Sequence, residues 1–259
     1  VHRMVSAHGP VRAAAALGVA REAAVRIAAG LPVRRGTLLL AEQALEEPNG
    51  LLAAGGDLAP GRLIAAYRRG IFPWYSPGQP ILWWSPDPRE VLEPRTFHAS
   101  RSLAKAVRSR GFMTTFDHAF AQVIDACAAP RQYSAGTWIT DAMRAAYLEL
   151  HRLGAAHSVE VWRDGRMVGG LYGVLQGAVF FGESMVSLET DGSKAALNAL
   201  ATRAAATGCE LIDCQLASPH LRSLGSRSMP RATFLARLEG LIAAPTATTF
   251  PQIEPNTRV

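Results

Sequence analysis

A β-hairpin is predicted by the run His157-Ser158-Val159-Glu160-Val161-Trp162-Arg163-Asp164-Gly165-Arg166-Met167-Val168-Gly169-Gly170-Leu171. Its first six residues follow the two-residue period of a β-strand, and Asp164-Gly165 is typical of a tight hairpin turn. Residues Arg166 to Leu175 are therefore expected to form the antiparallel partner. After a second turn, a third strand is expected from Ala178 to Val186.

A helix and one more strand extend this pattern. The helix is expected from about Ser193 to Thr207 and the strand from Glu210 to Gln215, so the second half runs β-β-β-α-β. Before Gly154 the sequence predicts short helices separated by proline-rich loops. The expected N-cap residues of these helices are Asp57, Ser100, Asp117 and Thr140.

These elements predict an α+β protein of two lobes. We expect an extension over residues 1–37, an N-terminal lobe over 38–154 and a C-terminal lobe over 155–259. With 259 residues, 49% hydrophobic and 19% charged, the chain is long enough to bury a core. The apolar stretch from Ala13 to Ala20 is too short to span a bilayer, which favours a cytoplasmic protein without a membrane partner.

Cysteine content and net charge narrow the class further. The chain has three cysteines, Cys127, Cys209 and Cys214. Because this number is odd and the cysteines lack C-x-x-C spacing, neither a disulfide framework nor a zinc site is indicated. The formal charge of +6 permits a polyanionic partner. Part of this excess lies in residues 1–37, to which we assign no function.

An aromatic run separates the expected helices of the first half. Trp74, Trp83 and Trp84 fall within eleven residues and are interleaved with prolines. Because proline fixes φ and removes a backbone donor, we expect this run to be neither helix interior nor central strand. Rigid indoles on a stiff loop are suited to stack against a nucleobase, although one or two of them could simply fill a domain edge.

Three polar residues of the second half could carry chemistry. By strand alternation, Phe181, Glu183 and Met185 are expected to share one face, which places a carboxylate between apolar side chains. Such a carboxylate is costly to bury unless a cation visits it.

The same alternation puts Asp213 and Gln215 together on the later strand and turns Cys214 toward the core, which argues against a nucleophilic thiol. For Asp213 and Gln215 the pattern alone is equally consistent with polar groups that satisfy nearby backbone at a strand end.

A basic stripe lies on the helix that follows the aromatic run. Arg101, Lys105 and Arg108 have i, i+4, i+7 spacing and share one face, which could meet a phosphate backbone or could merely be solvated. Trp138 precedes the next helix, where it could join a pocket or anchor the turn.

Eight sequence blocks, taken in order, resemble the bacterial leucyl/phenylalanyl-tRNA-protein transferase family. The resemblance runs from about Leu45 to Leu238. The blocks are Glu47-Pro48-Asn49-Gly50-Leu51-Leu52, Gly55-Gly56-Asp57-Leu58, Tyr67-Arg68-Arg69-Gly70-Ile71-Phe72-Pro73-Trp74, Trp83-Trp84-Ser85-Pro86-Asp87-Pro88-Arg89, Gly136-Thr137-Trp138-Ile139, His157-Ser158-Val159-Glu160-Val161-Trp162, Gly182-Glu183-Ser184-Met185 and Leu211-Ile212-Asp213-Cys214-Gln215.

The resemblance implies transfer of leucine or phenylalanine, with methionine as an open alternative, from aminoacyl-tRNA to a protein whose N-terminal residue is Arg or Lys, marking that protein for degradation. It also implies a C-terminal lobe similar to the acetyl-CoA-dependent N-acyltransferase fold, with no metal or nucleotide cofactor. We expect a monomer. The rival classes are a non-catalytic RNA-binding module and an acetyl-CoA-dependent N-acetyltransferase, whose pyrophosphate loop has no good match in Arg166-Met167-Val168-Gly169-Gly170-Leu171.

The resemblance further assigns roles to single residues. It places Trp74 and Trp138 at the terminal adenosine and aminoacyl group, Met185 and Leu171 in the apolar side-chain pocket, and the basic stripe against the tRNA. Glu183, Asp213 and Gln215 match residues of acceptor binding and catalysis. We expect Asp213 to orient Gln215, whose carbonyl accepts a hydrogen bond from the attacking amine, and Glu183 to pair with the cationic acceptor terminus; whether Asp213 is itself a base stays open.

Overall fold

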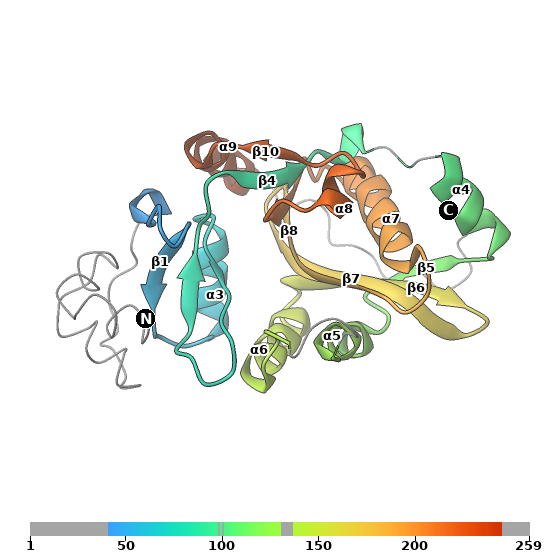
Figure 1. The fold of residues 1–259 in the computed structure, drawn as a ribbon, viewed down its shortest axis with the longest axis horizontal. Helices are drawn as coiled ribbons and strands as arrows, with labels where there is room; N and C mark the ends of the chain where they lie inside the picture. Colours follow the sequence, from blue (N-terminus) through green and yellow to red (C-terminus); the bar gives the residue numbers. More distant parts are fainter. Residues whose placement is uncertain (1–40, 98, 100, 131–136, 245–259) are drawn as a thin grey trace.

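The computed structural model describes residues 41–97, 99, 101–130 and 137–244, so the expected extension over 1–37 and the expected cap Ser100 lie outside the described residues. Two sheets organise these ranges (Figure 1). One has three strands in the order β1-β3-β2, and the other has seven in the order β10-β4-β9-β8-β7-β6-β5. The expected α+β class is thus present as a small N-terminal sheet and a larger mixed sheet.

The predicted β-β-β-α-β order forms the centre of the large sheet. β6 (Ala156–Arg163) and β7 (Arg166–Gln176) are joined at Asp164 and Gly165, whose φ angles of 51° and 73° are the positive values that a tight primed hairpin turn needs. β8 (Val179–Ser187) pairs antiparallel with β7. After α7 (Gly192–Thr207), β9 (Leu211–Gln215) returns parallel to β8.

Strands from outside that order complete the sheet. β5 (Met113–Phe116) lies beside β6, and β4 (Arg89–Leu92) lies between β9 and β10 (Arg227–Met229). The expected boundary near Gly154 stays a prediction, but β4 and β5 precede that residue and belong to the sheet whose other strands follow it. Arg89 of β4 is thereby brought next to Asp213.

The aromatic run contains the central strand of the small sheet, so the expectation that it could not is wrong. β3 (Leu82–Trp84) lies between β1 (Leu51–Ala54) and β2 (Phe72–Pro73). The prolines are compatible with this because they lie outside β3, and the one within a strand is on edge strand β2, where no neighbour needs its missing N–H. Trp83 is buried in the core, whereas Trp74 is 41% exposed.

Helices cover both faces of the large sheet (Figure 1). α5 (Phe120–Ala128) and α6 (Asp141–Arg152) lie on one face, and α7 lies on the other with α4 (Arg101–Ser109) beside it. The remaining helical elements are η1 (Ala41–Gln43), α3 (Pro60–Tyr67), η2 (Pro94–Thr96), α8 (Pro219–Arg222) and α9 (Arg231–Ala243). In the part of the chain that the structure describes, none of the helices combines the length and apolarity needed to cross a membrane.

One expected N-cap residue, Thr140, is confirmed, and two others, Asp57 and Asp117, are wrong. Thr140 caps α6, because its hydroxyl accepts the N–H of Met143 at 3.2 Å. The N-cap residues of α3 and α5 are instead Ala59 and Ala119. The Asp57 carboxylate instead accepts the N–H of Ala59, and the Asp117 carboxylate accepts the N–H of Ser158 in β6, so neither side chain caps its helix.

Candidate active site

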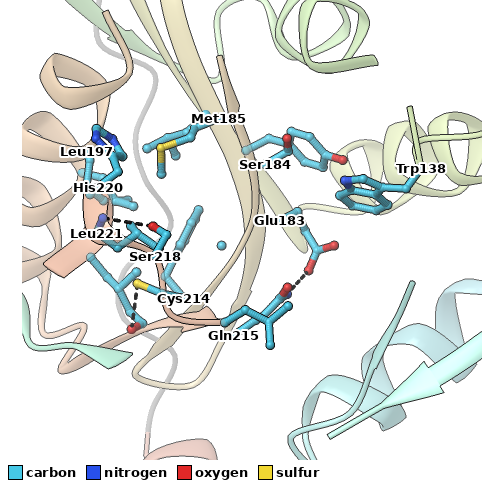
Figure 2. A pocket seen from close by; sticks show the side chains of 17 residues that line it. Trp138, Glu183, Ser184, Met185, Leu197, Cys214, Gln215, Ser218, His220 and Leu221 are labelled. Atoms are coloured by element: carbon cyan, nitrogen blue, oxygen red, sulfur yellow. Dashed lines mark hydrogen bonds between the residues drawn. The ribbon is translucent and has the colours of Figure 1, made fainter. Parts of the chain in front are cut away.

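A cavity of about 440 Å³ opens where β8 and β9 part. Their parallel pairing ends at Phe181 and Asp213, while β8 continues to Ser187, so the strands no longer fill the space between them. Figure 2 shows Glu183 and Gln215 on one side of this cavity and Met185 and Leu197 on another. The cavity lining also includes Trp138, Leu171, Tyr172, Phe180, Gly182, Ser184, Leu200, Ile212, Cys214, Leu216, Ser218, His220 and Leu221.

A bulge in β8 gives this cavity its two kinds of wall. Gly173 pairs with Gly182 and Tyr172 with Ser184, so Glu183 is an extra residue without a partner on β7. The expectation that Met185 shares the face of Phe181 and Glu183 is therefore wrong. Met185 packs on the opposite side of the sheet, where it pairs with Leu171, and both line the apolar end of the cavity.

A local reversal places Gln215 in the same cavity. Its φ of 63° is left-handed, which breaks the strand alternation after Asp213. The expectation that Cys214 turns toward the core is confirmed, since it packs against the buried cluster that contains Ile212, although both Cys214 and Gln215 also line the cavity. Burial raises the pKa of the Cys214 thiol far above its ordinary value, so the sulfur stays protonated and is a poor nucleophile.

Glu183 accepts three hydrogen bonds from three elements. Tyr67 of α3 donates to Oε1 at 2.7 Å, and Tyr147 of α6 donates to Oε2 at 2.7 Å. Gln215 Nε2 donates to Oε1 at 2.9 Å, the contact drawn as a dashed line in Figure 2. Because this amide nitrogen faces Glu183, the Gln215 carbonyl oxygen is free to face another way. Burial raises the pKa of Glu183 to about 7, although the three donors oppose that shift.

Asp213 does not line the cavity, because its carboxylate is fully buried against Arg89. Arg89 Nε and Nη2 donate to Asp213 Oδ1 and Oδ2 at 2.8 and 2.6 Å, and neither side chain is exposed to solvent. The guanidinium lies 4.8 Å from the ring centres of both Phe72 and Phe234. Asp213 Oδ1 also accepts the backbone N–H of Gln215 at 2.9 Å, so this ion pair holds the residue that turns into the cavity.

The remaining predicted site residues fall into two groups. Trp138 lines the cavity beside Glu183 (Figure 2), whereas Trp74 lies outside the cavity and packs at a tilt on Trp84, with ring centres 5.8 Å apart. Arg101, Lys105 and Arg108 are all exposed on one side of α4, while Leu103 of the same helix is buried. The predicted amphipathic geometry of α4 is thus confirmed.

Reasoning from the sequence missed several residues around the cavity. Arg89 follows a proline pair and carries no periodic signal. Tyr67 and Tyr147 are recognisable only as members of buried helix faces. A polar hydroxyl at such a position is a weak sign of a buried acceptor, because a buried tyrosine usually finds a hydrogen-bond partner. His220 also lines the cavity. Its imidazole pKa is lowered, mainly by burial and to a smaller extent by the positive charge of Lys194.

Comparison with known proteins points to one family. Residues 91–239 match the family described as leucyl/phenylalanyl-tRNA protein transferase, and residues 56–87 match the N-terminal domain of that family. A leucyl/phenylalanyl-tRNA–protein transferase of Chromohalobacter salexigens is 59% identical over 220 residues, covering 85% of this chain and 86% of the relative. The protein of the same name from Azoarcus sp. is 60% identical over 198 residues, covering 76% of this chain and 84% of the relative.

Likeness to solved structures is weaker. The structure of L-PGS from Bacillus licheniformis aligns with a TM-score of 0.36 and 11% identity, covering 65% of this chain and 54% of that one. A likeness of this size carries no argument about the fold or its chemistry.

Proposed function

Because this chain belongs to the leucyl/phenylalanyl-tRNA protein transferase family, and transfers leucine or phenylalanine from tRNA to protein N-termini, we propose that the cavity between β8 and β9 is where the transfer occurs. One observation carries this proposal. A buried carboxylate and a carboxamide meet, hydrogen-bonded to each other, at the polar end of an otherwise apolar cavity of suitable size for an aminoacyl group.

The apolar end of the cavity is suited to the transferred side chain. Leu171 and Met185 form a cross-strand pair there, and Leu197 of α7 faces them. This wall offers no charge to a leucine or phenylalanine side chain. Trp138 at the rim and the exposed indole of Trp74 are available to stack on the terminal adenosine, which would leave the ester near Gln215.

The polar end is suited to the acceptor. The donor ester is already activated, so the reaction needs proximity, a neutral amine and a stabilised oxyanion. We take the free Gln215 carbonyl to accept a hydrogen bond from the attacking amine and Glu183 to pair with the cationic terminus of an acceptor that begins with Arg or Lys. Transfer to such an acceptor would mark it for degradation.

Asp213 acts in this scheme as an organiser and not as a base. Both carboxylate oxygens are engaged by Arg89, and the carboxylate has no solvent exposure. Its part is to hold the backbone N–H of Gln215 and so fix the left-handed turn.

The proposal also includes the contact with the tRNA body, the cellular location, the oligomeric state and the fold of the C-terminal lobe. The exposed face of α4, with Arg101, Lys105 and Arg108, offers three cations to the phosphate backbone. Aminoacyl-tRNA is a cytoplasmic substrate, so we place the enzyme there, as a monomer. The bulged β8 and its parting from β9 favour the N-acyltransferase-like fold for the C-terminal lobe.

The rival activities are less well supported. An acetyl-CoA pyrophosphate loop should open a helix, but Arg166 to Leu171 lies within β7. A non-catalytic RNA-binding module gives no reason for an acid and an amide to be buried together in a cavity.

One assay separates these activities and tests Gln215. The protein is incubated with an Arg-initiated peptide and either labelled leucyl-tRNA or labelled acetyl-CoA. We expect label on the peptide only from leucyl-tRNA, and we expect Gln215→Ala to lower turnover while the dissociation constant for leucyl-tRNA changes little. Wild-type turnover in Gln215→Ala would refute its role, whereas peptide labelled from acetyl-CoA would replace the proposed activity.

A further inference from the structure

Glu183, Tyr67 and Tyr147 form a closed ring of side-chain oxygens, here called the Glu183 ring. Tyr67 contacts Oε1 and Tyr147 contacts Oε2, each at 2.7 Å, and the two hydroxyls also contact each other. The ring draws one residue each from α3, α6 and β8, and both tyrosines are fully buried. It borders the cavity through Glu183.

The Glu183 ring can hold one proton more than the two that the tyrosine hydroxyls supply. Each hydroxyl has a single hydrogen, so two hydrogens cannot fill three oxygen–oxygen contacts. When Glu183 is protonated on Oε2, it donates to Tyr147, Tyr147 donates to Tyr67, and Tyr67 donates to Oε1. When Glu183 is ionised, both tyrosine hydroxyls donate hydrogen bonds to it. Gln215 Nε2 donates to Oε1 in either protonation state.

We propose that Glu183, held in this ring, is the group that takes a proton from the terminal ammonium of the acceptor and so makes it nucleophilic. The inference rests on the proposed function of the cavity and adds a proton acceptor to it. Tyr67 and Tyr147 are positioning residues, since they act through Glu183.

The surroundings of Glu183 are suited to such a proton acceptor. The titratable groups that face it are Tyr67 from α3, Tyr147 from α6, Tyr172 from β7 and Asp213 from β9, and Arg89 of β4 neutralises Asp213. Burial is the largest influence and raises the pKa of Glu183 to about 7. An α-amine titrates at about 7.7 to 8.0, so proton transfer to this carboxylate is unfavourable by about tenfold, against more than about a thousandfold for an ordinary glutamate near 4.3.

The proton balance of the reaction closes with this assignment. The acceptor enters with three protons on nitrogen, and one passes to Glu183, which frees the lone pair. The carbon–nitrogen bond then forms, the bond from the acyl carbon to the ribose oxygen breaks, and the departing oxygen takes the second proton. The third proton stays on the product amide. Glu183 returns its proton to solvent, which is the one proton that the overall reaction releases.

The test compares the titration of Glu183 with the pH dependence of transfer. Infrared difference spectra between the wild type and Glu183→Gln give the midpoint of the protonated carboxyl band without any substrate. Because the Tyr147 hydrogen bond favours the ionised form, Tyr147→Phe should move that midpoint to higher pH. The acid limb of kcat/KM for leucyl transfer should move upward with it.

Two further variants sharpen the comparison. Tyr172→Phe is the matched control, because no described residue hydrogen-bonds its buried hydroxyl, and the carboxyl midpoint should stay at its wild-type pH. Glu183→Gln can keep the hydrogen bonds of the ring but cannot accept a proton, so its rate should fall by about 10²- to 10⁴-fold.

Failure of this inference is distinguishable from failure of the proposed function. If peptide is labelled but Tyr147→Phe shifts the carboxyl band without shifting the acid limb, the proton role is wrong and the transfer site stands. Labelling by Glu183→Gln at the wild-type rate would also overturn the proton role. If the wild type labels no peptide from leucyl-tRNA at any pH, the proposed function itself is wrong.

Discussion

At the scale of single residues, the pair formed by Arg89 and Asp213 is the most constrained feature near the cavity. It couples a strand of the N-terminal half to the strand that ends at Gln215, and it does so without solvent contact. An uncompensated buried charge is expensive, whereas a pair replaced on both sides by apolar groups often is not.

We therefore expect Asp213→Asn to lower the free energy of unfolding by about 3–5 kcal/mol, because it leaves Arg89 buried without its counter-ion. Urea denaturation measures this. The double variant Arg89→Met/Asp213→Leu should recover most of the stability but not the leucyl transfer. A single variant as stable as the wild type would show that the ion pair is not held as described.

Residue types alone identified part of the site and could not identify the rest. Glu183 and Gln215 were recognisable as polar groups among apolar ones, and the structure brings them together. Arg89 was not recognisable, because its partner Asp213 is 124 positions away and the residues next to Arg89 do not indicate an ion pair. The expected grouping of Asp213 with the cavity residues failed for the same reason, since Arg89 holds that carboxylate away from the cavity.

At the scale of elements, the bulge in β8 depends on a close approach to β7. A Cβ on Gly173 would collide with the carbonyl oxygen of Phe181 and would lie 2.6 Å from Cε1 of the Phe180 ring. Only glycine therefore permits the pairing of Gly173 with Gly182 that leaves Glu183 as the extra residue.

Gly173→Ala should lower the free energy of unfolding by about 1–3 kcal/mol and reduce leucyl transfer, because the added methyl displaces the bulged strand. Thermal melts and the transfer assay measure the two effects. Gly240→Ala is the control, since the same methyl on α9 meets nothing within 4 Å and should be neutral or stabilising. Equal melting temperatures for the Gly173 and Gly240 variants would contradict the described packing.

The exposed face of α4 makes a separate prediction about tRNA. Replacing Arg101 and Lys105 by alanine should weaken binding and reduce the slope of log affinity against log salt by about 0.7 to 0.9 per charge removed. Filter binding over a range of salt concentrations measures it, with Arg152→Ala on α6, across the sheet, as the control. An unchanged slope in the α4 double variant would show that this face is only solvated.

Alternation along strands was the most useful and the most fallible element-level rule. It predicted β6, β7 and β8 correctly, together with the turn at Asp164. It failed at Glu183 and Gln215, where an extra residue and a left-handed φ change which way the following side chains point. Both failures occur at the cavity, and neither leaves a mark in residue order that hydrophobic periodicity can detect.

At the scale of the whole molecule, the order of elements in the second half was predictable, but the completion of its sheet was not. β4, β5 and β10 have four, four and three residues, too few for a periodic pattern to show. Their partners come from distant parts of the chain, so only the folded structure reveals that β4 brings Arg89 to β9. The division into lobes at residue 154 stays a prediction.

In the proposed function, the amino acid being transferred lies in the cavity between β8 and β9. Met185 lines its apolar end and pairs across the strands with Leu171. Shortening Met185 to alanine should enlarge that end, which favours the larger phenylalanine over leucine by roughly tenfold, as expected when a pocket gains or loses a few carbon atoms. Leu188→Ala is the control, because Leu188 is exposed and lies outside the cavity lining.

The decisive measurement is therefore the ratio of kcat/KM for phenylalanine transfer to that for leucine transfer, in the wild type and in Met185→Ala. A loss of folded protein lowers both values equally and cancels in this ratio. We predict a clear rise toward phenylalanine in Met185→Ala and no change in Leu188→Ala. An unchanged ratio in Met185→Ala would contradict the placement of the amino acid in this cavity.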